Sequence, residues 1–311
     1  MIRLLLFILF VPSLALSQCA PNIGAQLGNF SGWQGDTGDV RIINNNTNQS
    51  AVFFTTYGIF NNLGYWGSNH MITSGTAYDP WSCNTIPVVC PGGGQYSFRL
   101  GNSESWCHAQ DMYYSYRVDP LNPILIYAFA PVLQDPYHAD SIQPAFLCYA
   151  KDSIGNIIPC TYYRVTASNL RGAIQCPSPG GSVAVSRTWK NVAVDMSAYA
   201  NRTITLYFQT SDCGYCAHFG YAYIDVIGCY PKNIEIPRCN LNGSTLTAPP
   251  GMSSYLWSTG QNTQSIIIGY GSGIIRSVTC NMLTTMGCPV VLTANSMLNC
   301  PCPTISMISH N

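Results

Sequence analysis

The sequence predicts an all-β protein: a double-sheet β-sandwich followed by a small immunoglobulin-like β-sandwich. After residue 17 the chain offers short alternating, β-branched and aromatic stretches, separated by Gly, Pro and Asn, and hardly any amphipathic helical segment. The 311 residues are 47% hydrophobic and 12% aromatic, which is enough apolar material for a large core.

Residues 1–17 are predicted to form a secretory signal peptide. Arg3 precedes an apolar run from Leu4 to Leu16, and Ala15-Leu16-Ser17 supplies the small residues of a cleavage site. The run is too short to span a bilayer, and no later segment approaches about 18 consecutive apolar residues. We therefore expect an extracellular protein, secreted or at the cell surface, with no transmembrane segment.

The first domain is expected at residues 18–230. Its nine strand candidates are 51–57, 95–100, 112–118, 124–132, 145–150, 161–166, 189–194, 203–209 and 220–227. This number of strands over about 210 residues favours one double-sheet sandwich over two small domains.

A second domain is expected at residues 231–298, because the composition changes after Cys229. Its strand candidates are 244–248, 254–257, 265–268, 274–279 and 289–293, with turns at Pro249–Gly251 and Ser258–Gly260. Five or six short strands in about 60 residues are typical of an immunoglobulin-like sandwich. Residues 299–311 would form a short tail.

The charge balance restricts the partners. Thirteen basic and thirteen acidic residues give a formal net charge of zero, and charged residues make up 8% of the chain, against about 25% in an ordinary globular protein. No basic cluster is available to neutralise phosphates, which argues against nucleic acids and anionic membranes. Neutral glycans or cell-surface proteins are better candidates.

Fifteen cysteines in an exported chain predict disulfides, with one thiol left over. Cys148 and Cys160 lie symmetrically about Ile154, on two apolar stretches joined by a segment rich in turn residues. Opposed residues of an antiparallel pair have Cα atoms about 4.5–5.5 Å apart, which suits a disulfide. We therefore expect a Cys148–Cys160 bond.

Two further pairings are suggested by position along the chain. Cys19 and Cys229 bracket the first domain, so a bond between them would join its first and last segments. Cys83 and Cys90 could close a small loop. Spacing alone does not determine connectivity.

Several motifs resemble those of secreted, multidomain Bacteroidetes-type surface proteins. Gly28–Trp33, Val132–His138 and His218–Asp225 are similar in order and spacing to a jelly-roll module with a more distant likeness to galactose-binding-like carbohydrate-binding modules. Tyr255–Ile266 resembles the core motif of the immunoglobulin-like or PKD-like repeats of gliding-motility-associated and adhesin-like proteins. The resemblance implies an all-β chain, a jelly-roll sandwich followed by a small immunoglobulin-like sandwich.

The resemblance also raises the question of a structural calcium ion. Such modules often hold calcium through an early acidic residue and the Asp of the last strand, here Asp225, but Gly24–Leu27 supplies no early carboxylate. Calcium needs six to eight oxygen ligands, and Asp36, Asp39 and backbone carbonyls would have to contribute. Calcium at Asp225 stays an alternative, and no other cofactor is expected.

The sequence contains no recognisable catalytic motif. There is no Gly-x-Ser-x-Gly elbow, no His-Glu-x-x-His and no phosphate-binding glycine loop. Glu104 and Asp111 flank an aromatic stretch and could serve as a glycosidase pair, but pairs of this kind also occur by chance. We expect a protein that is not an enzyme.

Cys213-Gly214-Tyr215-Cys216, with His218 close by, has the spacing of a redox motif or of half a zinc site. A redox motif would open a helix in a βαβ unit, whereas this one precedes a strand. Zinc would need two more ligands, and Cys176 and His138 are the candidates. Structural disulfides are the favoured interpretation, with zinc and redox activity as alternatives.

Aromatic and polar loop residues are the candidates for ligand binding, because sugars dock on flat rings and on hydrogen-bonding side chains. Trp81 and Trp106 lie among loop residues, and Asp135 and His138 belong to another predicted loop. The alternatives are rings that cover the sandwich and side chains that cap a turn. Trp33 and Trp257 lie in fold-defining motifs and are assigned to the core.

These observations predict a non-catalytic extracellular binding or adhesion protein that recognises glycans through loops of the jelly-roll module. One alternative is a structural stalk or filament component of the cell surface without a ligand pocket. Another is an accessory module cut from a larger secreted hydrolase. An open concave face lined by rings and amides would favour recognition, and sealed loops would favour a spacer.

Overall fold

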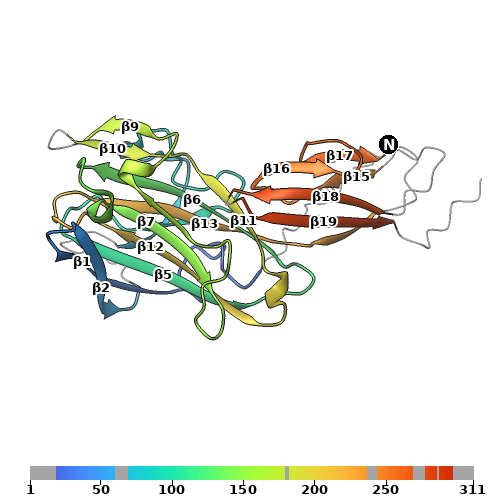
Figure 1. The fold of residues 1–311 in the computed structure, drawn as a ribbon, viewed down its shortest axis with the longest axis horizontal. Helices are drawn as coiled ribbons and strands as arrows, with labels where there is room; N and C mark the ends of the chain where they lie inside the picture. The colour runs from blue at the N-terminus through green and yellow to red at the C-terminus, as the bar shows by residue number, and fades with distance from the viewer. Residues whose placement is uncertain are drawn as a thin grey trace, which may run out of the picture.

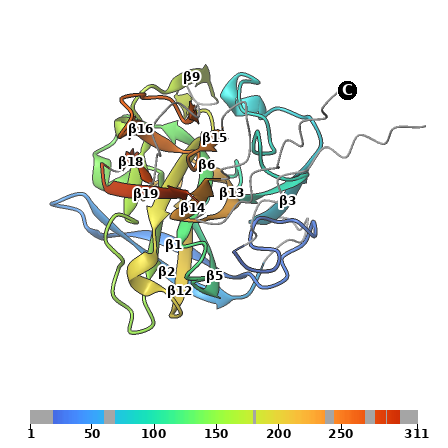
Figure 2. The same cartoon turned by 90° about the vertical axis from the view of Figure 1, so that its right-hand side faces the viewer.

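The computed structural model describes residues 19–59, 69–178, 182–236, 244–268, 277–285 and 287–296. The described chain is built from β-strands, loops and short 3₁₀ turns, in agreement with the all-β prediction. A large two-layer sandwich occupies one end of the elongated molecule, and a small group of strands occupies the other (Figure 1). The view along the long axis has the small group in front of the large sandwich (Figure 2).

The first layer of the large sandwich is an antiparallel six-stranded sheet in the order β2-β1-β5-β12-β7-β8. Its strands are β1 (Gln34–Asn44), β2 (Gln49–Tyr57), β5 (His108–Arg117), β7 (Ala145–Lys151), β8 (Tyr163–Thr166) and β12 (Thr203–Ser211).

The second layer is a seven-stranded sheet in the order β3-β4-β13-β6-β10-β9, with β11 also paired to β6. Its strands are β3 (His70–Ser74), β4 (Tyr96–Leu100), β6 (Ile124–Asp135), β9 (Ile174–Pro177), β10 (Val183–Ser186), β11 (Lys190–Asp195) and β13 (Gly220–Tyr230).

Large aromatic and aliphatic side chains fill the space between the two sheets. Trp33 is 5% exposed and contacts Phe98 and Tyr114 edge-on, with ring centroids 4.9 and 5.3 Å apart. Phe208 and Met112 from the six-stranded sheet complete the same cluster. The assignment of Trp33 to the core is therefore confirmed.

The small group of strands has two sheets. The first has the order β14-β19-β18-β16, with β14 parallel to β19, and the second pairs β15 with β17. The strands are β14 (Asn233–Ile236), β15 (Ser244–Thr247), β16 (Met252–Trp257), β17 (Ser265–Ile268), β18 (Ser277–Thr284) and β19 (Pro289–Ser296). Trp257 is 1% exposed, as its core assignment predicted. The immunoglobulin-like assignment and the domain limits stay predictions.

The two parts share a continuous interface. One buried cluster combines Ile124, Ile126 and Ile227 of the large sandwich with Leu246 and Trp257 of the small group. The ammonium group of Lys232 also lies 2.6 Å from a carboxylate oxygen of Asp195. The small group therefore packs against the outer face of the seven-stranded sheet.

The structure corrects the predicted Cys148–Cys160 bond. Strand β8 begins at Tyr163, which is the register partner of Cys148, so Cys160 precedes the strand in a left-handed turn with φ of 65°. Cys160 bonds instead to Cys288 of the small group, and Cys148 is a buried free thiol. The disulfide thus joins the two parts of the molecule.

The other two pairings have opposite outcomes. Cys19 and Cys229 are bonded, with Cα atoms 5.0 Å apart, as predicted. Cys83 bonds to Cys176 rather than to Cys90, because Cys90 points into the cluster beneath the small group. The fourth disulfide among the described residues is Cys107–Cys216. Residues 1–17 and 299–311 lie outside the described residues.

Candidate functional site

The outer face of the six-stranded sheet carries a group of aromatic and polar side chains. Strands β5, β12 and β7 alternate strictly: Met112, Phe208 and Cys148 point into the core, and the residues before and after them point outward. This alternation leaves one face of the sheet for polar and aromatic side chains.

Three tyrosines form a row across the middle of that face. Tyr113, Tyr207 and Tyr149 are register partners on β5, β12 and β7. Their rings stack, with centroids 5.3 and 4.9 Å apart and planes 29° and 13° from parallel. Since this spacing is close to the separation of neighbouring strands, the rings stand on edge and cover each other's faces. The row therefore presents its ring edges and hydroxyls outward.

These hydroxyls are neutral at physiological pH. Burial raises the pKa of Tyr149 to about 12, and it also raises the pKa values of Tyr113 and Tyr207. A neutral phenol can both donate and accept a hydrogen bond. The ammonium of Lys151 lies 5.4 and 5.2 Å from the centroids of Tyr149 and Tyr207, within the range of cation–π attraction.

A second row, polar except for Leu147, runs beside the tyrosine row at a distance of two residues on β5, β12 and β7. We call it the polar row. Asp36, Asp111, Gln209, Leu147 and Arg164 are successive register partners from β1 to β8. The backbone N–H of Asp36 donates to Oδ1 of Asp111 at 2.9 Å. Burial, and then the charge of Asp36, raise the pKa of Asp111 to about 7.

A pocket lies at one end of this face, beside the polar row. Residues 50–52 of β2 and Arg164 of β8 line one pocket of about 100 Å³, although these strands are the opposite edges of the sheet. The Ser50 hydroxyl closes this end by donating to the carbonyl of Ser141 at 2.6 Å. We call this face, with its tyrosine row, its polar row and the pocket at its end, the sheet groove.

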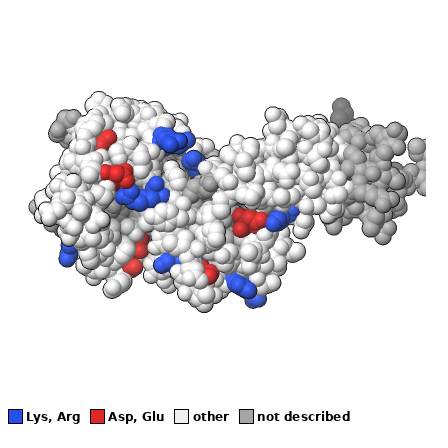
Figure 3. All heavy atoms as spheres, in the orientation of Figure 1, with Lys and Arg blue, Asp and Glu red and all other residues white. Residues whose placement is uncertain are grey.

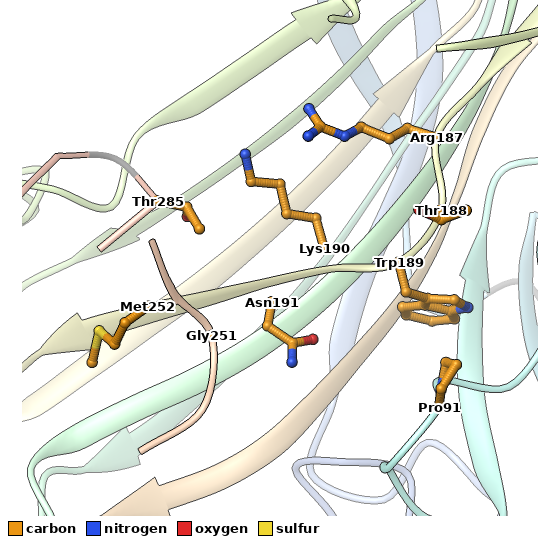
Figure 4. Close-up of a pocket in the computed structure, with 9 residues that line it drawn as sticks. All are labelled: Pro91, Arg187, Thr188, Trp189, Lys190, Asn191, Gly251, Met252 and Thr285. Carbon is orange, nitrogen blue, oxygen red and sulfur yellow. The ribbon is translucent and has the colours of Figure 1, made fainter. Parts of the chain in front are cut away.

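A second hollow lies where the large sandwich meets the small group. Its volume is about 460 Å³, and Arg187 and Lys190 extend to the same side of it while Trp189 lies on the other (Figure 4). None of the described residues that line this hollow is acidic. Charged side chains are few over this view of the surface (Figure 3), so the two neighbouring cations suit an anionic group rather than a neutral one.

A third cluster occupies the loops at the end of the large sandwich. His138 follows β6, and Cys213 and His218 belong to the β12–β13 connection; their ligand atoms all lie within 4.8 Å of one another. Cys213 Sγ is 3.3 Å from Nδ1 of His218. Burial, and then His138, lower the pKa of His218. Cys216 is bonded to Cys107, so this cluster contains one cysteine of the Cys-x-x-Cys motif.

The structure does not bring the four predicted ligand contacts together. Trp81 is half-buried and packs on Phe219 with centroids 5.7 Å apart, whereas Trp106 is 56% exposed on the loop before β5. Asp135 is buried and accepts hydrogen bonds from the Tyr137 N–H and the Gln143 side chain. His138 belongs to the loop cluster. A ligand role for each stays a prediction.

The surroundings of Asp225 do not resemble a calcium site. Its carboxylate is 1% exposed, accepts a hydrogen bond from the Ser97 hydroxyl at 2.9 Å, and has its pKa raised to about 7 by burial. Within the described residues, the group of His, Cys and acidic side chains that could share an ion is the His138 cluster. Calcium at Asp225 stays a prediction without support from these contacts.

The comparisons with known proteins give a broad likeness of fold. No family model matches the chain, and no curated protein matches its sequence. A family 61 carbohydrate-binding module, TmCBM61, in complex with β-1,4-galactotriose is 12% identical with a TM-score of 0.33, and the match covers 69% of this chain and 98% of that chain. The family 11 carbohydrate-binding module from Clostridium thermocellum, in complex with a mixed-linked tetrasaccharide, is 9% identical with a TM-score of 0.25, over 66% and 94%.

An enzyme is also among the similar structures. β-1,2-Glucanase from Parabacteroides distasonis is 11% identical with a TM-score of 0.23, and the match covers 75% of this chain and 37% of that chain. Identities and TM-scores this low leave the site to be argued from the residues of this chain.

Sequence reasoning missed the sheet groove. The signal was present, because Tyr113, Tyr149 and Tyr207 each lie one residue from a core residue within a predicted strand. What the sequence lacks is the strand order: β5, β12 and β7 are neighbours in the sheet but lie far apart in the chain. The prediction that Trp81 and Trp106 contact a ligand rests on their position in loops, which does not depend on the strand order.

Proposed function

We propose that the chain is an extracellular binding protein that recognises neutral glycans in the sheet groove, without transforming them. The observation that carries the proposal is the row of three stacked tyrosines beside the polar row and the pocket on one sheet face. Four disulfides among the described residues agree with an extracellular protein. The described chain contains no helix with the length and apolar character needed to cross a bilayer.

The chemistry of the groove suits sugar hydroxyls. A sugar hydroxyl both donates and accepts hydrogen bonds, and the groove supplies neutral phenols, carboxyl groups, an amide and a guanidinium. Each such bond contributes about 0.5–1.5 kcal/mol. Because the tyrosine rings stack on one another, flat ring faces remain only at the two ends of the row. We therefore expect recognition mainly by hydrogen bonding, with stacking on Tyr113 or Tyr149.

The small group of strands has the role of a spacer in this proposal. It packs on the seven-stranded sheet and is bonded to the large sandwich through Cys160–Cys288, away from the sheet groove. The alternative of a stalk without a ligand pocket requires that the groove bind nothing. Glycan binding therefore separates the two interpretations.

The test is binding of the purified full chain to a panel of soluble neutral polysaccharides and an array of neutral oligosaccharides. For the best ligand, Tyr207→Ala should weaken binding about tenfold or more, because it removes the central ring and a hydroxyl. Tyr207→Phe keeps the ring and should weaken binding about two- to tenfold. Lys190→Ala, in the hollow at the junction, is the matched control and should bind as the unchanged protein does.

Failure to bind any neutral glycan would contradict the proposal. So would Tyr207 variants that bind normally. If Lys190→Ala abolished binding instead, the recognition site would be the hollow beside Arg187 and not the sheet groove.

A second candidate function is glycoside hydrolysis in the same groove. One observation favours it: Asp36 and Asp111 are direct register partners, and the pKa of Asp111 is about 7, which suits a general acid. The test is release of reducing sugar from the bound polysaccharide. Turnover that Asp111→Asn abolishes would make the chain a hydrolase, and its absence would leave binding as the function.

A further inference from the structure

We propose that His138, Cys213 and His218 form a binding site for one zinc ion, with water or an external ligand in a fourth position. Two imidazoles and one thiolate are ligands that zinc accepts in tetrahedral sites. Hard cations such as calcium and magnesium prefer oxygen ligands. The residue types therefore select a borderline-soft metal ion.

The distances suit one small ion. With Zn–S of about 2.3 Å and Zn–N of about 2.0–2.1 Å, neighbouring ligand atoms of a tetrahedral site lie about 3.4–3.6 Å apart. Cys213 Sγ and His218 Nδ1 are already 3.3 Å apart, and the three ligand atoms all lie within 4.8 Å of one another. Rotation of the His138 side chain is the main adjustment that the third ligand needs.

A buried nitrogen of His138 without a hydrogen-bond partner is an independent indication of a metal site. This nitrogen is Nδ1, and buried polar atoms of native proteins rarely lack a partner. The His138 ring lies edge-on to His218, with centroids 5.3 Å apart, and to Tyr215 at 5.0 Å. A metal ion among these side chains would give the nitrogen its partner.

The backbone holds the two ligands of the β12–β13 connection in place. The N–H of Cys213 donates to the carbonyl of His218 at 2.9 Å, which closes a tight loop between them. The preceding Asp212 carboxylate accepts from the backbone N–H groups of Trp106, His108 and Gly220. A site whose ligands are fixed before binding loses little conformational freedom on taking up the metal.

The metal would connect two segments at the closed end of the sheet groove. His138 precedes the 3₁₀ turn Asp140–Ile142, whose Ser141 closes the groove by its contact with Ser50. Gly214, next to Cys213, donates its N–H to the carbonyl of Ile142 at 2.9 Å. Zinc would therefore stabilise the wall of the groove, while the zinc site itself does not depend on glycan binding.

The competing chemistry is thiol–disulfide exchange. The Cys213 thiolate could attack Cys216, form a Cys213–Cys216 bond and release Cys107 as a thiol, with no external oxidant. Either Cys213 or Cys107 would then be the free thiol, and the other would be bonded to Cys216. Because a cysteine in a disulfide cannot act as a thiolate ligand, this outcome and the zinc site exclude each other.

The experiment uses the full chain after treatment with a chelator. Titration calorimetry with Zn²⁺ should give one ion per chain, and Co²⁺ should produce a thiolate-to-cobalt charge-transfer band. Cys213→Ser should abolish that band. His138→Gln, a half-exposed position chosen so that folding is kept, should weaken zinc binding at least about 100-fold, since loss of a supporting group alone costs 10–100-fold. Cys280→Ser, a buried thiol in the small group of strands, is the control and should change neither.

Three results would overturn the site. They are the absence of zinc binding, zinc binding that survives both Cys213→Ser and His138→Gln, and peptide mapping that finds a Cys213–Cys216 bond in the native protein. The last result would assign the thiol to disulfide exchange.

Discussion

The two sheets of the large sandwich share a core but differ in what covers their outer faces. Every residue of β6 in the seven-stranded sheet is buried, and β13 is buried over all but its last residue. The small group of strands covers one part of this face. Ile86, Trp81 and Trp189 cover another part. Among the described residues, no such cover lies over Tyr113, Tyr207 and Tyr149 of the six-stranded sheet, which are half-buried.

Because of this difference, we assign stability to residues of the covered face and ligand recognition to residues of the open face. On the covered face, polar groups meet one another: the hydroxyls of Tyr221 and Tyr223 donate to Oδ2 of Asp79 at 2.6 and 2.8 Å. On the open face, the tyrosines stack on one another and are half-buried, so part of each ring remains accessible at the surface. Substitutions on the covered face should therefore change the free energy of unfolding, and those on the open face should change binding.

The largest expected effect is that of Asp79→Ala. Removing this carboxylate leaves two buried tyrosine hydroxyls without their acceptor, at about 1–3 kcal/mol each. Chemical denaturation should show a loss of roughly 2–6 kcal/mol in the free energy of unfolding. Asp39→Ala, which breaks an exposed pair with Arg41, is the control and should cost less than about 1 kcal/mol. Equal losses in the two variants would refute the contrast between the faces.

The disulfide between the two parts should have the next largest effect. Replacing Cys160 and Cys288 together by Ser removes a link between positions 128 residues apart. The expected loss is about 2–4 kcal/mol, because the unfolded chain gains freedom. Calorimetry should show the small group of strands unfolding earlier, while glycan binding in the sheet groove is unchanged. A loss of binding would mean that the small group contributes to recognition.

Stability should also depend on pH through a buried carboxyl of the covered sheet. Burial raises the pKa of Asp225 to about 7 in the folded protein, above its value of about 3.9 in the unfolded chain. Its stabilising contribution is complete below the unfolded pKa and is lost as the pH rises through about 7. Asp225 alone should therefore lower the free energy of unfolding by about 2–3 kcal/mol between pH 5 and pH 8.

Asp225→Asn isolates this contribution, because the amide oxygen can still accept from Ser97. Thermal unfolding of the variant should depend less on pH across this range than that of the unchanged protein. If both curves have the same slope, Asp225 is not the group responsible.

The sequence predicts the fold better than it predicts the site, because the pattern of apolar and polar residues along a single strand shows which of its faces are buried. The continuous apolar run at Ile124–Val132 indicates a strand buried on both faces, which β6 is. The alternating run Thr203–Gln209 indicates one open face, which β12 has. Strand β1 was not predicted because glycine and polar residues interrupt its pattern, and β10 was not predicted because it is only four residues long.

Pairings between distant segments could not be predicted in this way. The Cys160–Cys288 bond and the groove depend on which segments become neighbours in space, and spacing along the chain does not encode this. His138 was named as a zinc candidate together with Cys176, but Cys176 is bonded to Cys83 and lies outside the cluster.

The smallest expected effect tests the loop hypothesis against the groove. Trp106 is exposed on the loop that leads into β5, and its backbone N–H donates a hydrogen bond to the Asp212 carboxylate. Its side chain would therefore extend the binding surface at the rim of the sheet groove. Residues at the rim of an interface contribute little, and Trp106→Ala should weaken glycan binding no more than about threefold. The same titration with Tyr207→Ala gives the reference for a central contact. Should Trp106→Ala weaken binding more than Tyr207→Ala does, the loops rather than the sheet groove would be the recognition surface.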